Sequence, residues 1–279
     1  MTAVLEAPAP AGFPFSMFDD VHVGLDEYGE HVYINLAERN VLVGGEPGSG
    51  KSSGVNLIVA HGALSYDCKL ILTDGKLVEL GLWRACADRF IGPSITDAIA
   101  AFTEFQGIMN RRYDKLLAQG RRKISRDDGE DIYLIPIDEY AFYTTVVGNK
   151  KEREDFAALT RDLVARGRAA GVIVILATQR PSHQVIDPSL RDLFGYRWAF
   201  RCTTDSSSDV VLGHGWTKEG YDASTIDPLA RGVSYLLSET GVPRKIKAAY
   251  LTDDDIRYLA AYAARLRHAK DAASKDAAA

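Results

Sequence analysis

Residues 45–52 carry the first group of side chains whose types and spacing could do chemistry. They read GEPGSGKS and match the pattern G-x-x-x-x-G-K-[ST] without a mismatch. In such a loop, glycines let backbone N–H groups turn toward a phosphate, Lys51 can reach the β- and γ-phosphates, and Ser52 can bind Mg²⁺. A glycine-rich turn that happens to carry a lysine is the alternative. The apolar run NVLV before the loop and the helical spacing after it favour phosphate binding.

This interpretation predicts ATP and Mg²⁺ as cofactors. The helix expected to begin near Lys51 would point the positive end of its dipole at the same phosphates. The predicted nucleotide contacts are a continuous stretch of the chain, namely Gly45, Glu46, Pro47, Gly48, Ser49, Gly50, Lys51, Ser52 and Ser53.

Two adjacent acids, Asp138 and Glu139, follow the apolar run IPI and could complete the chemistry. Asp138 would hold Mg²⁺ together with Ser52, and Glu139 would orient or deprotonate the attacking water. Alternatively, the two acids only begin a turn after a buried strand. With the phosphate-binding loop expected on a neighbouring strand, we favour the catalytic interpretation.

A third polar group follows the apolar run VIVILA at 172–177. Thr178, Gln179 and Arg180 would stand at the end of that strand, beside the phosphate-binding loop. Gln179 is therefore a candidate to contact the γ-phosphate or the attacking water and to report hydrolysis to the loop that follows. An ordinary exit from strand to loop is the alternative interpretation.

Strands and helices must alternate to bring these groups together. Strands are expected at 31–36, 40–45, 69–73, 131–137, 172–178 and 196–204, and helices at 51–66, 94–119 and 154–171. The first two strands would be joined by AERN, a hairpin-like or short connection. Several strands are apolar on both faces, which is typical of parallel sheets covered by helices. The sequence predicts an α/β fold with a mostly parallel central sheet flanked by helices.

Composition sets further limits on function. The 279 residues carry a formal net charge of −5, so a polyanion would have to meet a local basic patch. The three cysteines form no CxxC pair, which argues against a zinc site or a disulfide framework. Neither an apolar run of membrane-spanning length nor a secretion signal is evident. A cytoplasmic protein without a transmembrane segment of its own is expected.

Several stretches together resemble the FtsK/SpoIIIE family of double-stranded DNA translocases. They lie between about 40 and 256 and read GEPGSGKS, DGKLVEL, MNRRYDKL, IPIDEY, RGRAAGVIVILATQRPS and TDDDI. A closer resemblance is to the short FtsK-like transfer proteins of actinobacterial conjugative plasmids and integrative elements, the TraB/TraSA type. The stretches SDVVLGHGW and KAAYLTDDDI fit that branch.

The resemblance implies a RecA-like P-loop NTPase core of the ASCE type, assembled as a homo-hexameric ring that threads duplex DNA. Lys51 with Ser52 and Asp138 with Glu139 then match the family's Walker A and Walker B pairs. Arg168 matches an arginine presented in trans to a neighbour's ATP, where it would spread transition-state charge. A helix C-terminal cation is the alternative role for Arg168. Two arginines of the long helix, Arg111 and Arg112, are weaker candidates for the same catalytic role.

Two loops would face the pore of such a ring. One spans 146–155 and contains Lys150, Lys151 and Arg153, and the other follows Arg180 and contains Arg191. Contacts there would go to phosphates and would be blind to sequence and sensitive to salt. For any single one of these residues, a solvated surface charge is the alternative.

The expected organisation is a flexible N-terminal arm at 1–20, an FtsK-like motor domain at 21–265 and a disordered or frayed tail at 266–279. The leading hypothesis is ATP-dependent translocation of double-stranded DNA in conjugative transfer. A protein-secretion ATPase of the type VII kind and a nucleotide-gated docking protein that hydrolyses little are the alternatives. Membrane attachment would need a membrane-anchored partner protein.

Overall fold

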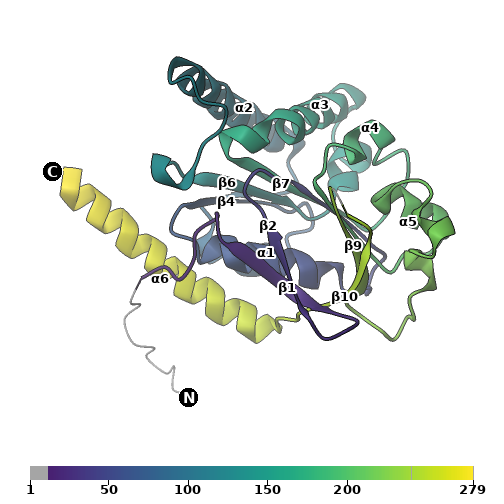
Figure 1. Ribbon diagram of the computed structural model, residues 1–279. Helices are drawn as coiled ribbons and strands as arrows, with labels where there is room; N and C mark the ends of the chain where they lie inside the picture. The colour runs from purple at the N-terminus through teal and green to yellow at the C-terminus, as the bar shows by residue number, and fades with distance from the viewer. Residues whose placement is uncertain (1–11, 240, 279) are drawn as a thin grey trace.

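A single ten-stranded sheet forms the centre of the computed structural model, which describes residues 12–239 and 241–278 (Figure 1). Across the sheet the order is β2 (His31–Asn35), β1 (Asp20–Asp26), β10 (Arg244–Ala248), β9 (Val233–Ser238), β8 (Tyr196–Phe200), β3 (Val41–Gly44), β7 (Val172–Thr178), β6 (Ile132–Ile137), β4 (Cys68–Thr73) and β5 (Arg89–Ile91).

The sheet has a parallel half and an antiparallel half. Strands β8, β3, β7, β6, β4 and β5 run parallel to one another, whereas β9, β10, β1 and β2 join through antiparallel pairs. Every residue of β7 and β3 is buried, as expected for central parallel strands covered on both faces. The predicted α/β fold with a mostly parallel sheet is confirmed.

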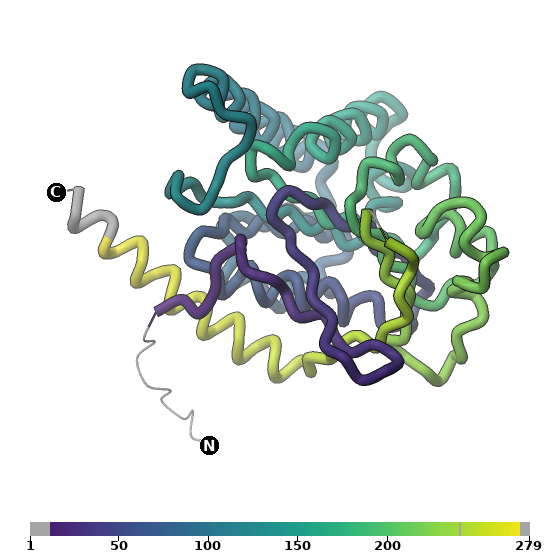
Figure 2. Tube along the Cα trace, in the orientation of Figure 1, coloured from purple at the N-terminus to yellow at the C-terminus, as the bar shows by residue number. Residues whose placement is uncertain are grey.

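Helices cover both faces of the sheet. On one face α1 (Lys51–Ala63) packs with α6 (Asp253–Ala278), and on the other α2 (Ile95–Ala118) packs with α3 (Lys150–Arg166) (Figures 1 and 2). The first layer buries apolar residues of α1 such as Ile58, and the second brings the rings of Phe102 and Phe156 to a centroid distance of 4.9 Å. The shorter helices α4 (Pro188–Arg191) and α5 (Asp205–Leu212) follow β7 and β8.

The six predicted strands and three predicted helices are all present, but four strands were missed. These are β1, β5, β9 and β10, of which all but β5 belong to the antiparallel half. The connection after β2 is short, as one of the two alternatives expected, but it is not a hairpin, because β1, β10, β9 and β8 lie between β2 and β3 in the sheet. Ser94 caps the start of α2, since its side chain accepts a hydrogen bond from the N–H of Asp97 at 3.2 Å.

The predicted N-terminal arm is wrong for its last residues. Phe15 bridges to Ser65, the side chain of Met17 is buried, and β1 already begins at Asp20. The hydroxyl of Ser16 donates to the Asp67 carboxylate at 2.5 Å, which fixes this segment on the domain. Residues 1–11 of the predicted arm lie outside the described residues.

The predicted tail at 266–279 also needs correction, because helix α6 continues to Ala278. Leu266 is buried in the core, and the Arg267 guanidinium donates to the carbonyls of Gly62 at 3.0 Å and Ala63 at 3.2 Å at the end of α1. A cation at these carbonyls satisfies groups that a helix end leaves unpaired. Only residue 279 of the predicted tail lies outside the described part.

All three cysteines are buried at separate places in the fold. Burial raises the pKa of the Cys68 and Cys202 thiols to about 12 and that of Cys86 to about 11. These thiols therefore stay protonated and unreactive near neutral pH. Within the described residues, no helix combines the length and apolar character needed to cross a bilayer.

Candidate nucleotide-binding site

The phosphate-binding loop joins the end of β3 to the start of α1, in the order that the sequence predicted. Gly48 and Gly50 adopt positive φ angles of 78° and 98°, which residues with a side chain rarely adopt. A Cβ at Gly50 would lie 2.5 Å from the backbone nitrogen of Gly232, which itself donates to the carbonyl of Ser49 at 2.8 Å. The loop is therefore held against the turn before β9, and only glycine fits at position 50.

Lys51 and Asp138 meet in the interior, with Nζ and Oδ1 3.0 Å apart. Their side chains are 3% and 1% exposed, so this ion pair is almost completely desolvated. The strands that carry the two segments are not neighbours, however, because β7 lies between β3 and β6. The expected adjacency of those strands is wrong, although the predicted meeting of the loop with the acidic pair is confirmed.

Glu139 is held by the end of β7, the strand that lies between β3 and β6. Its Oε1 accepts a hydrogen bond from the Thr178 hydroxyl at 2.9 Å, and its Oε2 accepts one from the Gln179 N–H at 3.2 Å. Lys76 Nζ lies 3.6 Å from Oε2. The Glu139 side chain is only 8% exposed, so these contacts fix its orientation. A carboxylate oriented in this way can position a water molecule.

One atom of Asp138 supports the predicted Mg²⁺ site. Its Oδ2 is buried without a hydrogen-bond partner among the described residues. Mg²⁺ prefers carboxylate and other oxygen ligands and usually keeps several waters. The Asp138 carboxylate and the Ser52 hydroxyl at the start of α1 therefore make a donor set that fits this ion.

Asp74 organises the segment DGKLVEL, to which the sequence assigned no chemical role. The Asp74 side chain is fully buried and accepts from the N–H groups of Lys76 at 2.8 Å, Leu77 at 3.0 Å and Leu80 at 3.0 Å. These bonds close the turn that brings Lys76 to Glu139. Nearby, burial raises the pKa of the Tyr143 phenol, and the negative charges of Asp74 and Asp138 add to that rise.

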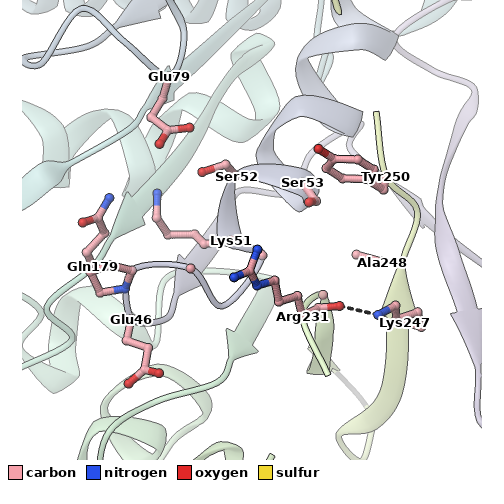
Figure 3. Close-up of a pocket in the computed structure, with 14 residues that line it drawn as sticks. Glu46, Lys51, Ser52, Ser53, Glu79, Gln179, Arg231, Lys247, Ala248 and Tyr250 are labelled. Carbon is pink, nitrogen blue, oxygen red and sulfur yellow. Dashed lines mark hydrogen bonds between the residues drawn. The ribbon is translucent and has the colours of Figure 1, made fainter. Parts of the chain in front are cut away.

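A cavity of about 690 Å³ opens above the loop (Figure 3). It is lined by Lys51, which contacts Asp138, and by Gln179, which contacts Glu139. The other predicted residues that line it are Glu46, Pro47, Gly48, Gly50, Ser52 and Ser53. Its remaining wall includes six residues that the sequence interpretation missed, namely Glu79, Arg231, Gly232, Lys247, Ala248 and Tyr250. Lys247 and Ala248 are the last two residues of β10, and Arg231 and Tyr250 lie just outside β9 and β10, which were not predicted as strands. Their only signal was the stretch KAAYLTDDDI, which contains Lys247, Ala248 and Tyr250 and was noted for its family resemblance alone.

The remaining predicted loop residues contact the fold around the cavity. The carboxylate of Glu46 pairs with Arg201 and accepts a hydrogen bond from the Thr203 hydroxyl at 3.0 Å. A Cβ at Gly45 would lie 2.7 Å from the Phe200 side chain, so this glycine permits close packing against β8. Ser49 is buried, and its hydroxyl makes no hydrogen bond to the described residues.

Arg168 lies at the opposite end of β7 from Gln179, in the 3₁₀ turn Gly167–Ala170. Its guanidinium contacts the Glu38 carbonyl and the Glu239 carboxylate, with Nη1 and Oε1 3.1 Å apart. It therefore stands away from its own cavity, and its role in trans stays a prediction. Arg112, one of the two weaker candidates, is buried and donates to the Ala170 carbonyl at 2.7 Å, so an internal role replaces the catalytic one.

Both segments predicted to contact DNA need correction. Lys150, Lys151 and Arg153 lie on the first turn of α3 rather than in a loop, because Asn149 and Glu152 form a capping box there. Arg191 is 8% exposed and forms an ion pair with Asp192, with Nε and Oδ1 2.8 Å apart. The fold therefore engages Arg191 internally, whereas the Lys150 side chain is 85% exposed.

Comparisons with known proteins agree with this geometry. The chain is 28% identical over 274 residues to the DNA translocase FtsK of Vibrio vulnificus, covering 85% of this chain and 27% of that protein. With the FtsK of Staphylococcus epidermidis RP62A it shares 29% identity over 273 residues, covering 90% and 32%. The chain thus spans about a quarter to a third of the length of these relatives.

Two solved structures share the fold. The conjugation coupling protein TcpA of pCW3, in its monomer form with ATPγS, superposes with a TM-score of 0.77 at 21% identity, covering 92% of this chain and 75% of that one. The cytoplasmic domain of the type VII secretion ATPase EccC of Thermomonospora curvata gives a TM-score of 0.70 at 23% identity, covering 93% and 32%. Both support a P-loop NTPase-like fold for this chain.

The sequence profile of the FtsK/SpoIIIE family matches residues 13–211, from just before β1 to the end of α5. The match includes the phosphate-binding loop, the acidic pair and the end of β7. Because it extends over well more than half of the chain, the chain belongs to the FtsK/SpoIIIE family.

Proposed function

We propose that this protein hydrolyses ATP with Mg²⁺ to move double-stranded DNA, in the conjugative transfer of a plasmid or integrative element. The observation that carries the proposal is the joint geometry of Lys51, Asp138 and Glu139 at the carboxyl ends of β3 and β6. The names of the relatives support DNA translocation, and the similarity to a conjugation coupling protein supports the transfer role.

Each side chain has a defined part in the proposed hydrolysis. Lys51 would exchange Asp138 for the β- and γ-phosphates, and the backbone N–H groups of the loop would hold the same anion. Mg²⁺, held through Ser52 and Asp138, would supply positive charge to the phosphate oxygens. Glu139 would orient the attacking water and accept its proton. Gln179, bonded to Glu139 through its N–H, would pass the state of the site to the segment that follows β7.

Coupling to DNA requires several subunits in the proposed mechanism. In a homo-hexameric ring, Arg168 of one subunit would reach the ATP of the next subunit. There its guanidinium would spread transition-state charge. The exposed amines of Lys150 and Lys151 would contact DNA phosphates in a sequence-independent way. A cytoplasmic location, with membrane attachment through a membrane-anchored partner protein, belongs to the same proposal.

Displacement of a third strand from a triple helix tests translocation directly. ATP and Mg²⁺ are added to the protein with a duplex that carries a labelled triplex at one end, and release of the third strand is followed over time. We expect release with ATP and none with a nonhydrolysable analogue or with Glu139→Gln. Robust ATP turnover without strand release would contradict the proposal.

The alternative functions give different results in the same experiment. A protein-secretion ATPase of the same fold would hydrolyse ATP without displacing the third strand and would respond to a peptide partner. A nucleotide-gated docking protein would bind ATP with little turnover.

The double substitution Lys150→Ala/Lys151→Ala should reduce the salt dependence of DNA affinity. The slope of log affinity against log salt concentration becomes shallower by about 0.9 for each phosphate that the protein no longer neutralises.

A further inference from the structure

The cavity extends well beyond the groups that would hold phosphates. Lys51 and Ser52 lie at one side of it, and Tyr250 and Ala248 lie at the other, with Ser53 and Arg231 between them (Figure 3). Because the start of α1 and Lys51 fix where phosphates would bind, the rest of a nucleotide must extend toward Tyr250 or into solvent. The Tyr250 side of the cavity is therefore the place to seek a nucleoside site.

Tyr250 is 71% exposed, although Ala248 before it and Ile256 after it are buried. It follows β10 and comes two residues before Thr252, whose hydroxyl accepts the N–H of Asp255 at 3.1 Å at the start of α6. Among the described residues, the Tyr250 ring stacks on no other ring and its hydroxyl makes no hydrogen bond. Of the described residues that line the cavity, it is the only aromatic one. A ring mounted between two packed elements and without a partner is suited to stacking on a planar ligand.

Arg231 is another side chain of the cavity wall without a partner among the described residues. Its guanidinium makes no ion pair or hydrogen bond with the described residues. Its backbone, by contrast, is fixed: its carbonyl accepts a bond from the Lys247 amine, and the next residue, Gly232, donates to the Ser49 carbonyl at 2.8 Å. Among the described residues, the turn before β9 therefore carries an unpaired cation next to the phosphate-binding loop (Figure 3).

We propose that the ring of Tyr250 stacks on the base of the bound nucleotide and that Arg231 contacts its phosphate chain. The assignment rests on the proposed function, because it takes ATP as the ligand of the cavity. It explains why the antiparallel β9 and β10 are locked to the loop through Gly232: Arg231 just before β9 and Tyr250 just after β10 would both contact the ligand. It also gives the two unpartnered groups one common ligand.

Binding of ATP compared with binding of inorganic tripolyphosphate tests the role of Tyr250. Both ligands occupy the loop, but only ATP has a base. Using the full chain with Mg²⁺ in titration calorimetry, we expect Tyr250→Ala to weaken ATP binding about tenfold and to leave tripolyphosphate binding unchanged. Tyr250→Phe should retain ATP affinity. Tyr258→Ala is the matched control, because Tyr258 is a 60% exposed tyrosine on α6 outside the cavity.

Three results would overturn this assignment. If the wild type binds ATP and Tyr250→Ala binds it equally well, base stacking is refuted but the proposed function is not. An equal loss of ATP and tripolyphosphate affinity in that variant would show a structural effect on the loop instead. If the wild-type protein bound tripolyphosphate but not ATP, the proposed function and the base site would fail together.

The role of Arg231 is tested separately, by measuring the binding of the same two ligands. Arg231→Ala should weaken ATP and tripolyphosphate by a similar factor, about three- to tenfold, because an exposed guanidinium gives a moderate charge-assisted contact. Arg231→Lys should recover part of that affinity by keeping the charge. Unchanged binding of both ligands in Arg231→Ala would remove this residue from the site.

Discussion

The two sides of the cavity are built in different ways. On the side of the parallel strands, Lys51, Asp138 and Glu139 are buried and bonded to the protein itself. On the side of the antiparallel strands, Arg231 and Tyr250 are exposed and have no side-chain partners among the described residues. In the proposed mechanism, the groups that perform chemistry are therefore oriented before ATP binds, whereas Tyr250 and Arg231 gain their partners only from the ligand. Substitutions on the two sides should therefore have different effects.

The largest effect should come from removing the proposed base. Glu139→Gln keeps the size of the side chain and an oxygen for the Thr178 hydroxyl, but it cannot accept the proton of the attacking water. We expect the turnover number to fall by about 10²- to 10⁴-fold while ATP binding is retained. Steady-state turnover and equilibrium ATP binding measure the two quantities, and turnover close to wild type would exclude Glu139 as the base.

A large effect on stability should follow from breaking the buried ion pair. Lys51→Ala leaves the Asp138 carboxylate buried without its cation, and loss of one partner of such a pair is strongly destabilising. In urea unfolding without Mg²⁺, we expect a loss of about 3–5 kcal/mol in the free energy of unfolding.

The double variant Lys51→Ala/Asp138→Asn should recover much of that stability but no hydrolysis, because it removes the uncompensated charge and the phosphate contact together. Arg231→Ala is the comparison from the other side of the cavity and should change the unfolding free energy by less than about 0.5 kcal/mol. Equal destabilisation by Lys51→Ala and Arg231→Ala would erase the proposed difference between the two sides.

A smaller loss of stability is expected at Asp74. Asp74→Ala deprives the N–H groups of Lys76, Leu77 and Leu80 of their acceptor. Because the N–H of Leu80 is buried and would be left without a partner, we expect a loss of about 1–3 kcal/mol. Asp74→Asn keeps one acceptor oxygen and should lie between the wild type and Asp74→Ala. Thermal and urea unfolding measure the loss, and an unchanged stability in Asp74→Ala would contradict this role.

The smallest effect should come from Lys76, whose side chain is 42% exposed. Its contact with Glu139 is screened by solvent, and such pairs contribute little, about 0–1 kcal/mol. We expect Lys76→Ala to lower the turnover number by less than about fivefold, with a smaller difference from wild type at high salt. A loss as large as that of Glu139→Gln would instead make Lys76 part of the chemistry.

The local patterns of the site could be predicted from the sequence. The spacing of glycines around Lys51 and the acids after an apolar strand are short-range signals, and the structure brings both segments together. The order of the strands could not be predicted in the same way, because pairing between β3, β7 and β6 depends on contacts that are distant along the chain. For that reason the sequence placed Thr178 and Gln179 beside the phosphate-binding loop, but their position between the two motifs became evident only in the structure.

Other errors had signals that the interpretation did not use. Asn149 and Glu152 have the spacing of a capping box, which would have placed Lys150 on a helix rather than in a loop. Arg267 looked like one charge in a polar tail, and only the fold shows the carbonyls of α1 beside it. Tyr250 followed a strand that the pattern did not reveal, so no local rule could place its ring in the cavity.

The rate of ATP hydrolysis with and without long double-stranded DNA tests the central claim most directly. The rate is measured for the wild-type protein at fixed ATP and Mg²⁺, with Glu139→Gln as the matched control for contaminating activity. We predict a marked increase in turnover with duplex DNA for the wild type and background rates for Glu139→Gln. A wild-type rate that duplex DNA leaves unchanged, or equal turnover in both proteins, would contradict the account.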